Sequence, residues 1–331
     1  MAKEVAVKAK QEITTIVGAS HIVPVVPGDV EVYEDMGDGS EATGLEEVTM
    51  AERRIPILRP LDPKSPQCNP PENGGIAGAT GGTIFNTATS EIYDRKLGLY
   101  MIPCHTELKY VCYIKRDADG SGGGFVSIHE PEDPFVEKCR QERMRLFGDL
   151  FGKWPAGESE EGKEKELVET HYLYGIMVKP NEDGTYPGEY GSFFPAGIPF
   201  ASTQIKQHGA FIERCKNLKY NIRHKDGVIR PTEVALWSHV WRLLPHLEKR
   251  GTQTWWGWRT SLAAKGADGM ELDKKHSRLL RDNPLFIAAE ELRTTILEGN
   301  AQVEYAKDAQ SGDAGGDVAE DQPNKKTDIP F

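Results

Sequence analysis

The chain has 331 residues, 27% of them charged, with five cysteines and a formal net charge of −11 at pH 7. Its length suffices for one large domain or two ordinary ones, and no run approaches the roughly 18 consecutive apolar residues of a membrane helix, so we expect a soluble protein without a membrane partner. The cysteines are odd in number and lack CxxC spacing, and no apolar signal sequence opens the chain, which predicts free thiols in the cytoplasm.

Composition divides the chain into three parts. Residues 1–50 are acidic and poor in large apolar residues, which predicts a partly disordered N-terminal arm. We expect residues 51–306 to form the globular body of the protein. Residues 307–331 have no periodicity and many small and acidic residues, and we expect them to form a disordered acidic tail.

The first half of the body has the pattern of short β-strands. Four segments are rich in β-branched and aromatic residues and are bounded by turn signals: "TIFNTA", "LGLYMI", "LKYVCYIKR" and "GFVSIH". "RDADGSGGG" predicts the hairpin loop between the last two. A later strand is expected in "LVETHYLYGIMVKP", after a solvated loop in "PAGESEEGKEKE".

Three helices are expected around these strands. The first starts where Asp133 can cap and Pro134 fits the first turn. The second starts near Ser202 or Thr203. The third, in "NPLFIAAEELRTTILEGNAQVEYA", has an apolar stripe that should cover the core. The predicted fold class is α+β with a β-rich core, and functional analogy suggests an OB-like barrel.

The negative net charge hides an uneven distribution. Residues 203–281 contain eight Lys and eight Arg against seven Asp or Glu, a net charge of +9. Residues 1–202 carry −13 and residues 282–331 carry −7. A basic section between acidic flanks indicates a partner that is a polyanion.

The basic section also holds five of the six tryptophans. Cations along the phosphates and flat rings for stacking bases are what a groove for single-stranded nucleic acid needs. The alternative is that the tryptophans are core residues and the charges form a solvated helix face. The candidate nucleic-acid-binding residues are Lys206, Arg214, Lys216, Lys219, Arg223, Lys225, Arg230, Trp237, Trp241, Arg242, Trp255, Trp256, Trp258 and Arg259.

Signatures of catalysis are missing from the sequence. The best metal-like cluster, Cys104 with His105 and Cys112, does not match a zinc template. No HExxH, GxSxG or paired DxD motif is present. We therefore expect no enzyme activity, no catalytic residues, no metal and no cofactor.

The last residues, "TDIPF", resemble the C-terminal peptide of bacterial single-stranded-DNA-binding proteins, which follows a flexible acidic linker. The resemblance implies that Phe331 anchors the peptide in an apolar pocket on replication and recombination proteins. Pro330 and Ile329 would support it, and Asp328 would be the acidic partner. Thr327 stands where that family has a second Asp.

The body loosely resembles uncharacterised proteins of tailed bacteriophages, through "IPILRPLDPKSP", "STQIK" and "WGWRTSL". Together these features predict a non-sequence-specific single-stranded-DNA-binding protein of phage replication or recombination, acting in the host cytoplasm and recruiting host or phage proteins through its tail. The alternatives are an interaction protein that engages host repair factors through the hook, and a virion or assembly protein without DNA binding. The sequence leaves open whether the chain forms a homo-oligomer.

Overall fold

The computed structural model describes residues 54–116, 122–188, 191–223, 225, 227–250, 253–262 and 277–303. The predicted N-terminal arm, the predicted acidic tail and its hook at Asp328, Ile329, Pro330 and Phe331 lie outside the described residues.

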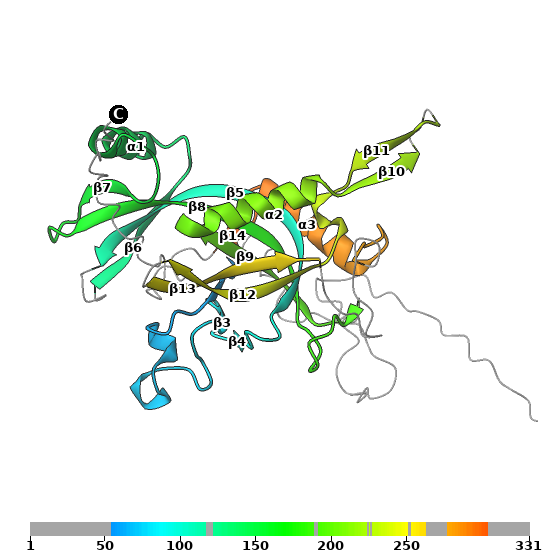
Figure 1. Cartoon of the computed structure of the whole chain (residues 1–331), viewed down its shortest axis with the longest axis horizontal. Helices are drawn as coiled ribbons and strands as arrows, with labels where there is room; N and C mark the ends of the chain where they lie inside the picture. The colour runs from blue at the N-terminus through cyan, green and yellow to red at the C-terminus, as the bar shows by residue number, and fades with distance from the viewer. Residues whose placement is uncertain are drawn as a thin grey trace, which may run out of the picture. The chain divides into compact units, whose positions relative to one another are not determined.

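The described residues form an α+β fold, as predicted (Figure 1). The helices are α1 (Pro134–Phe147), α2 (Ile205–Lys216) and α3 (Pro284–Leu297). The strands are β1 (Arg54–Ile55), β2 (Leu58–Pro60), β3 (Ile84–Asn86), β4 (Ile92–Tyr93), β5 (Leu99–Arg116), β6 (Gly122–His129), β7 (Trp154–Glu158), β8 (Glu164–Val178), β9 (Phe193–Ala201), β10 (Lys219–Arg223), β11 (Ile229–Glu233), β12 (Trp241–Arg250), β13 (Gln253–Ser261) and β14 (Gln302–Val303). None of these helices is long and apolar enough to cross a membrane.

A long antiparallel pair, β5 with β8, is the spine of a seven-stranded sheet. The order is β13-β12-β5-β8-β7, with β6 added to β5 and β9 added to β8. At one end of the spine lie β9, β12 and β13, and at the other lie β6 and β7. Among the described strands, no pairing closes this order into a ring, so the OB-like barrel finds no support.

Each helix covers a separate part of the sheet. α3 packs through Leu285, Phe286 and Ala289 on one core cluster. α2 contributes Phe211 to a second cluster with the strands of the β9–β13 end. α1 contributes Val136 and Cys139 to a third, at the β6–β7 end.

Local signals account for where two of the helices begin. Asp133 Oδ1 accepts from the Phe135 amide at 2.8 Å ahead of α1, and Asn283 Oδ1 accepts from the Leu285 amide at 2.9 Å ahead of α3. In both helices a proline occupies the first turn, where its missing N–H costs no helical hydrogen bond. The predicted start of α1 and the apolar face of α3 are confirmed, whereas the predicted start near Ser202 is a 3-10 turn, Ser202–Gln204, that leads into α2 at Ile205.

Two strand predictions differ from the structure. "LGLYMI" and "LKYVCYIKR" belong to one 18-residue strand, because an irregularity between Pro103 and His105 lets the ladder with β8 continue past a proline. The segment predicted as a solvated loop, residues 155–166, contains most of β7 and the start of β8, and the pair Trp154 and Leu167 lies directly outside it. Trp154 is buried there, and this burial stabilises the hairpin.

Candidate nucleic-acid interface

Most of the predicted basic residues lie on α2 and on the β10–β11 hairpin, which follow each other in the chain. We call residues 205–233 the basic arm. This segment has seven Lys or Arg against three Asp or Glu. The cations on it are Lys206, Arg214, Lys216, Lys219, Arg223, Lys225 and Arg230, and all seven residues are exposed.

α2 is fixed on β12 and β13 by polar contacts at both of its ends. At its start, Gln204 Oε1 accepts from the Trp258 amide at 2.8 Å, and its Nε2 donates to Glu248 at 2.7 Å. Near its end, Arg214 donates to the Thr260 carbonyl at 2.9 Å and to its hydroxyl at 2.8 Å. Gly257 leaves the room that Gln204 occupies. Arg214 therefore holds α2 in place as well as adding charge to its surface.

The β10–β11 hairpin projects away from the sheets (Figure 1). Its strands pair antiparallel from Lys219 opposite Glu233 to Arg223 opposite Ile229. At its base the Tyr220 hydroxyl lies 2.8 Å from His239 Nε2, and the Arg278 guanidinium lies 4.7 Å from the centre of the Tyr220 ring. The hairpin was not predicted from the sequence, although Asp226-Gly227 between "YNIR" and "VIRP" is a hairpin turn signal.

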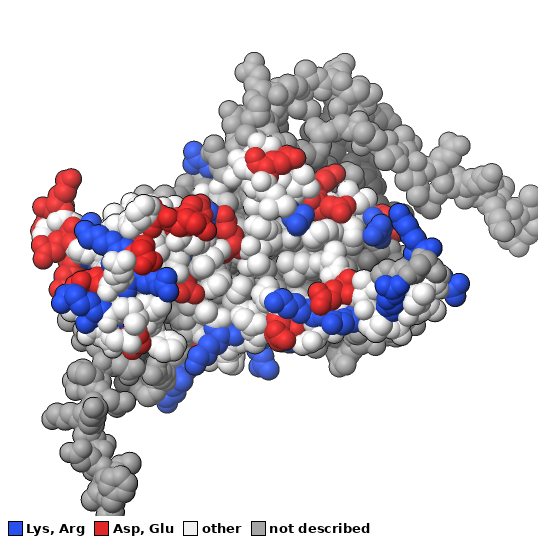
Figure 2. All heavy atoms as spheres, turned by 90° about the horizontal axis from the view of Figure 1, so that it is seen from above, with Lys and Arg blue, Asp and Glu red and all other residues white. Residues whose placement is uncertain are grey.

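Surface charge follows this division of the molecule. Figure 2 shows mainly Lys and Arg at the end that carries the β10–β11 hairpin, and many Asp and Glu toward the end that carries α1 and β7. A polyanion would therefore be attracted to the end with the basic arm.

Two of the predicted stacking residues are buried in the core. Trp241 and Trp258 are each 2% exposed, and Phe211 of α2 meets the Trp241 ring edge-on, with the ring centroids 4.9 Å apart. Neither ring can stack on a base while the core is intact. The position of these two residues agrees with the alternative interpretation, in which the tryptophans belong to the core.

The other three tryptophans of the section are half-buried. Trp237 meets Phe286 of α3 edge-on, with the Arg293 guanidinium 5.4 Å from its ring centre. Trp256 lies on the Gly-rich loop before β3: a Cβ on Gly82 would come within 2.6 Å of the indole, and the Arg95 guanidinium lies 5.2 Å from its ring centre. Both rings have packing roles that the sequence did not reveal.

Trp255 and Arg259 lie on the same face of β13, separated by Gly257, because side chains alternate along a strand. Trp255 is half-buried and Arg259 is exposed. Arg242 on β12 has a structural role: it donates to the Leu97 carbonyl at 3.2 Å. Among the residues of the predicted groove on β12 and β13, Trp255 and Arg259 are thus the pair best placed to contact a single-stranded nucleic acid.

His208 anchors α2 to the sheet. Its Nε2 lies 2.9 Å from the Thr106 hydroxyl, and its ring stacks on His171 of β8 at 4.7 Å. His171 in turn lies 3.0 Å from Glu169. Burial, and then the neighbouring His171, lower the pKa of His208 to about 4.

This lowered pKa predicts that acid weakens the fold at α2. Unfolded His208 binds a proton near pH 6.5, whereas the folded residue does so only near pH 4. Above pH 6.5 His208 therefore does not lower the free energy of unfolding. As the pH falls from 6.5 toward 4, protonation of the unfolded chain lowers this free energy by up to about 3 kcal/mol. Urea unfolding at several pH values in this range, with His208→Gln beside wild type, measures it. Equal pH dependence in both proteins would contradict the assignment.

A hydroxyl, an imidazole and a carboxylate line up where β6 leads into α1. His129 Nε2 lies 2.7 Å from Ser127 Oγ, and Nδ1 lies 2.7 Å from Asp133 Oδ2. Asp133 is also the cap of α1, and its pKa is lowered by His129 and by the Phe135 amide. We interpret these contacts as structural, because they hold the end of β6 against the start of α1. Among the described residues no group of three or more His, Cys, Asp or Glu could hold a metal ion.

Residues 28–302 match the model of a family described as "Pam3 phage gp34-like protein". No curated protein and no solved structure matches the chain.

Proposed function

The chain belongs to the Pam3 phage gp34-like family, and we propose that it binds single-stranded DNA without sequence preference during phage replication or recombination. The observation that carries the proposal is the exposed basic arm: seven cations on a helix and a projecting hairpin of a chain whose net charge is −11. The chain as a whole is acidic, yet these cations are clustered and exposed. A cluster of exposed cations is the arrangement that phosphate neutralisation requires.

The arm supplies the electrostatic part of binding in this proposal, and Trp255 with Arg259 supplies a place where a base can stack. Trp256 and Trp237 contribute mainly by supporting this surface, since their rings are packed against the Gly82 loop and Phe286. Trp241 and Trp258 hold the core beneath it.

The tail gives the proposal its second element. Residues 307–331 hold six Asp or Glu and three Lys, and end on the apolar "IPF". We propose that this segment recruits replication or recombination proteins through Phe331, and that its carboxylates compete with DNA for the basic arm.

Fluorescence anisotropy of a labelled oligo-dT tests both elements. The full chain should bind the oligonucleotide at low salt, and the affinity should fall steeply as salt rises. The chain without residues 307–331 should bind more tightly, because the competing carboxylates are gone. Absence of binding at low salt would favour the interaction-protein alternative, and unchanged affinity after truncation would contradict competition by the tail.

A further inference from the structure

The β10–β11 hairpin carries the same pair of side chains on each of its two faces. Residues directly opposite each other in an antiparallel pair share a face, and successive residues of a strand lie on opposite faces. Ile222 lies opposite Arg230, and Arg223 lies opposite Ile229. Each face therefore holds one isoleucine beside one arginine. A partner that contacts only one face would leave the second pair without a role.

Both faces are accessible beyond the base of the hairpin. Ile222, Ile229 and the two arginines opposite them are exposed, and so is Val228 next to the turn. Residues 219–233 hold four Lys or Arg against two Asp or Glu. A single DNA strand offers apolar base faces next to anionic phosphates. An exposed isoleucine beside an arginine is therefore complementary to one strand, and the hairpin has two such pairs.

The base of the hairpin is fixed to the body. Tyr220 of β10 places its hydroxyl 2.8 Å from Nε2 of His239, which is buried. Nδ1 of His239 in turn lies 2.9 Å from the Ser238 hydroxyl. The Arg278 guanidinium lies 4.7 Å from the centre of the Tyr220 ring. The hairpin thus projects in a defined direction (Figure 1), which lowers the entropy cost of binding.

The length of the hairpin sets how much DNA each face can follow. β10 and β11 have five residues each. Five residues of an antiparallel strand span about 17 Å. One strand of a DNA helix advances by about 3.4 Å per nucleotide, so each face can follow about five nucleotides.

We propose that the hairpin enters a DNA fork, the point at which a duplex separates into two single strands, with one strand along each face. Ile222 and Ile229 contact the first unpaired bases of the two strands, and Arg230 and Arg223 contact their phosphates. Val228 faces the last base pair. Apolar side chains of DNA-bending proteins enter the base stack in a related way. The inference rests on the proposed DNA binding and specifies the form of DNA that the basic arm takes.

Fluorescence anisotropy with matched DNAs tests the proposal. A fork with two oligo-dT arms is compared with a duplex of the same length that carries a single oligo-dT arm of the combined length, so that both have equal charge. Wild type should bind the fork at least about tenfold more tightly, because only the fork covers both isoleucines. A blunt duplex should bind more weakly than either. Shortening both arms well below about five nucleotides should abolish the preference.

A hairpin variant with Ile222→Ser and Ile229→Ser keeps every cation of the basic arm. Its preference for the fork over the single-armed duplex should fall to within about twofold, because serine buries little apolar surface. The ratio of the two affinities is the quantity that decides, since a general loss of DNA affinity lowers both alike. Unfolding midpoints near the wild-type value establish that the variant is folded.

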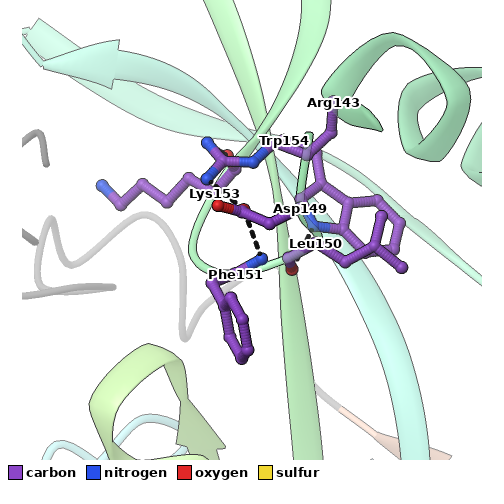
Figure 3. A network of polar contacts seen from close by, with 6 residues as sticks. All are labelled: Arg143, Asp149, Leu150, Phe151, Lys153 and Trp154. Atoms are coloured by element: carbon purple, nitrogen blue, oxygen red, sulfur yellow. Dashed lines mark hydrogen bonds and ion pairs between the residues drawn. The ribbon is translucent and has the colours of Figure 1, made fainter. Parts of the chain in front are cut away.

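The turn after α1 supplies a matched control, Met144→Ser with Phe151→Ser. Both residues are exposed and lie outside the hairpin, Phe151 to 82%. Asp149 holds this turn by accepting from Arg143 at 2.8 Å and from the Phe151 amide at 2.9 Å, and the Phe151 ring points away from these contacts (Figure 3). The ring can therefore be removed without loss of the contacts. This control should prefer the fork as strongly as wild type does.

Three results would overturn the inference. The first is equal affinity of wild type for the fork and the single-armed duplex. The second is a preference for the fork that survives in the hairpin variant. The third is a blunt duplex bound as tightly as the fork, which would indicate that the hairpin lies in a duplex groove. Oligo-dT binding without a fork preference contradicts this inference alone, whereas no binding to any of these DNAs contradicts the proposed function as well.

Discussion

Replacing Arg223, Lys225 and Arg230 together by Gln is expected to weaken oligo-dT binding by about ten- to a hundredfold near physiological salt. These cations lie on the projecting hairpin and are exposed, so their loss removes charge without disturbing a core. If each neutralises one phosphate, the slope of log affinity against log salt should become shallower by about 2. Anisotropy titrations at several salt concentrations measure both quantities.

The α1 end of the molecule supplies a control of equal charge. Lys138, Arg140 and Lys163 are exposed but lie in the acidic section, and their replacement by Gln should leave the affinity within about twofold. Similar losses for both triple variants would show that net charge alone governs binding. That outcome would contradict a role for the hairpin.

The second large effect concerns the core beneath the surface. Trp241→Ala should destabilise the fold by about 3–5 kcal/mol, because it removes a fully buried ring packed against Phe211. Trp255→Ala should cost less stability, because its ring is half-buried, and it should weaken oligo-dT binding by up to about tenfold. Urea unfolding followed by circular dichroism gives the free energies, and anisotropy gives the affinities.

The comparison separates stacking from packing. Trp258→Ala serves as a second core variant, since Trp258 is equally buried. If Trp241→Ala kept nearly wild-type stability but lost DNA binding, the residue would act in stacking as the sequence suggested, and its buried position would not describe the functional state.

Features encoded by neighbouring residues were predictable. Asp133-Pro134 marks the start of α1, and the apolar stripe of α3 follows from its helical period. The long β5 was expected as two strands, and the irregularity after Pro103 that makes it one strand forms in its pairing with β8, which is distant in the sequence.

Which tryptophans are buried could not be predicted, because their burial depends on residues that are distant in the sequence. Trp256 lies on Gly82, more than 170 positions earlier in the chain, and Trp237 lies on Phe286 of α3. Composition identifies the basic section but does not tell which of its rings face solvent. The exposure of Phe147 and Phe151 could not be predicted either, because the sequence around an apolar residue does not tell whether a distant element covers it.

Ultraviolet cross-linking of the full chain to oligo-dT substituted with bromodeoxyuridine, followed by peptide mapping, tests the central claim most directly. The account predicts cross-links within residues 205–233 and at the β13 segment that contains Trp255 and Arg259, and their loss at high salt. Cross-links confined to residues 122–169, or none at low salt, would contradict the account.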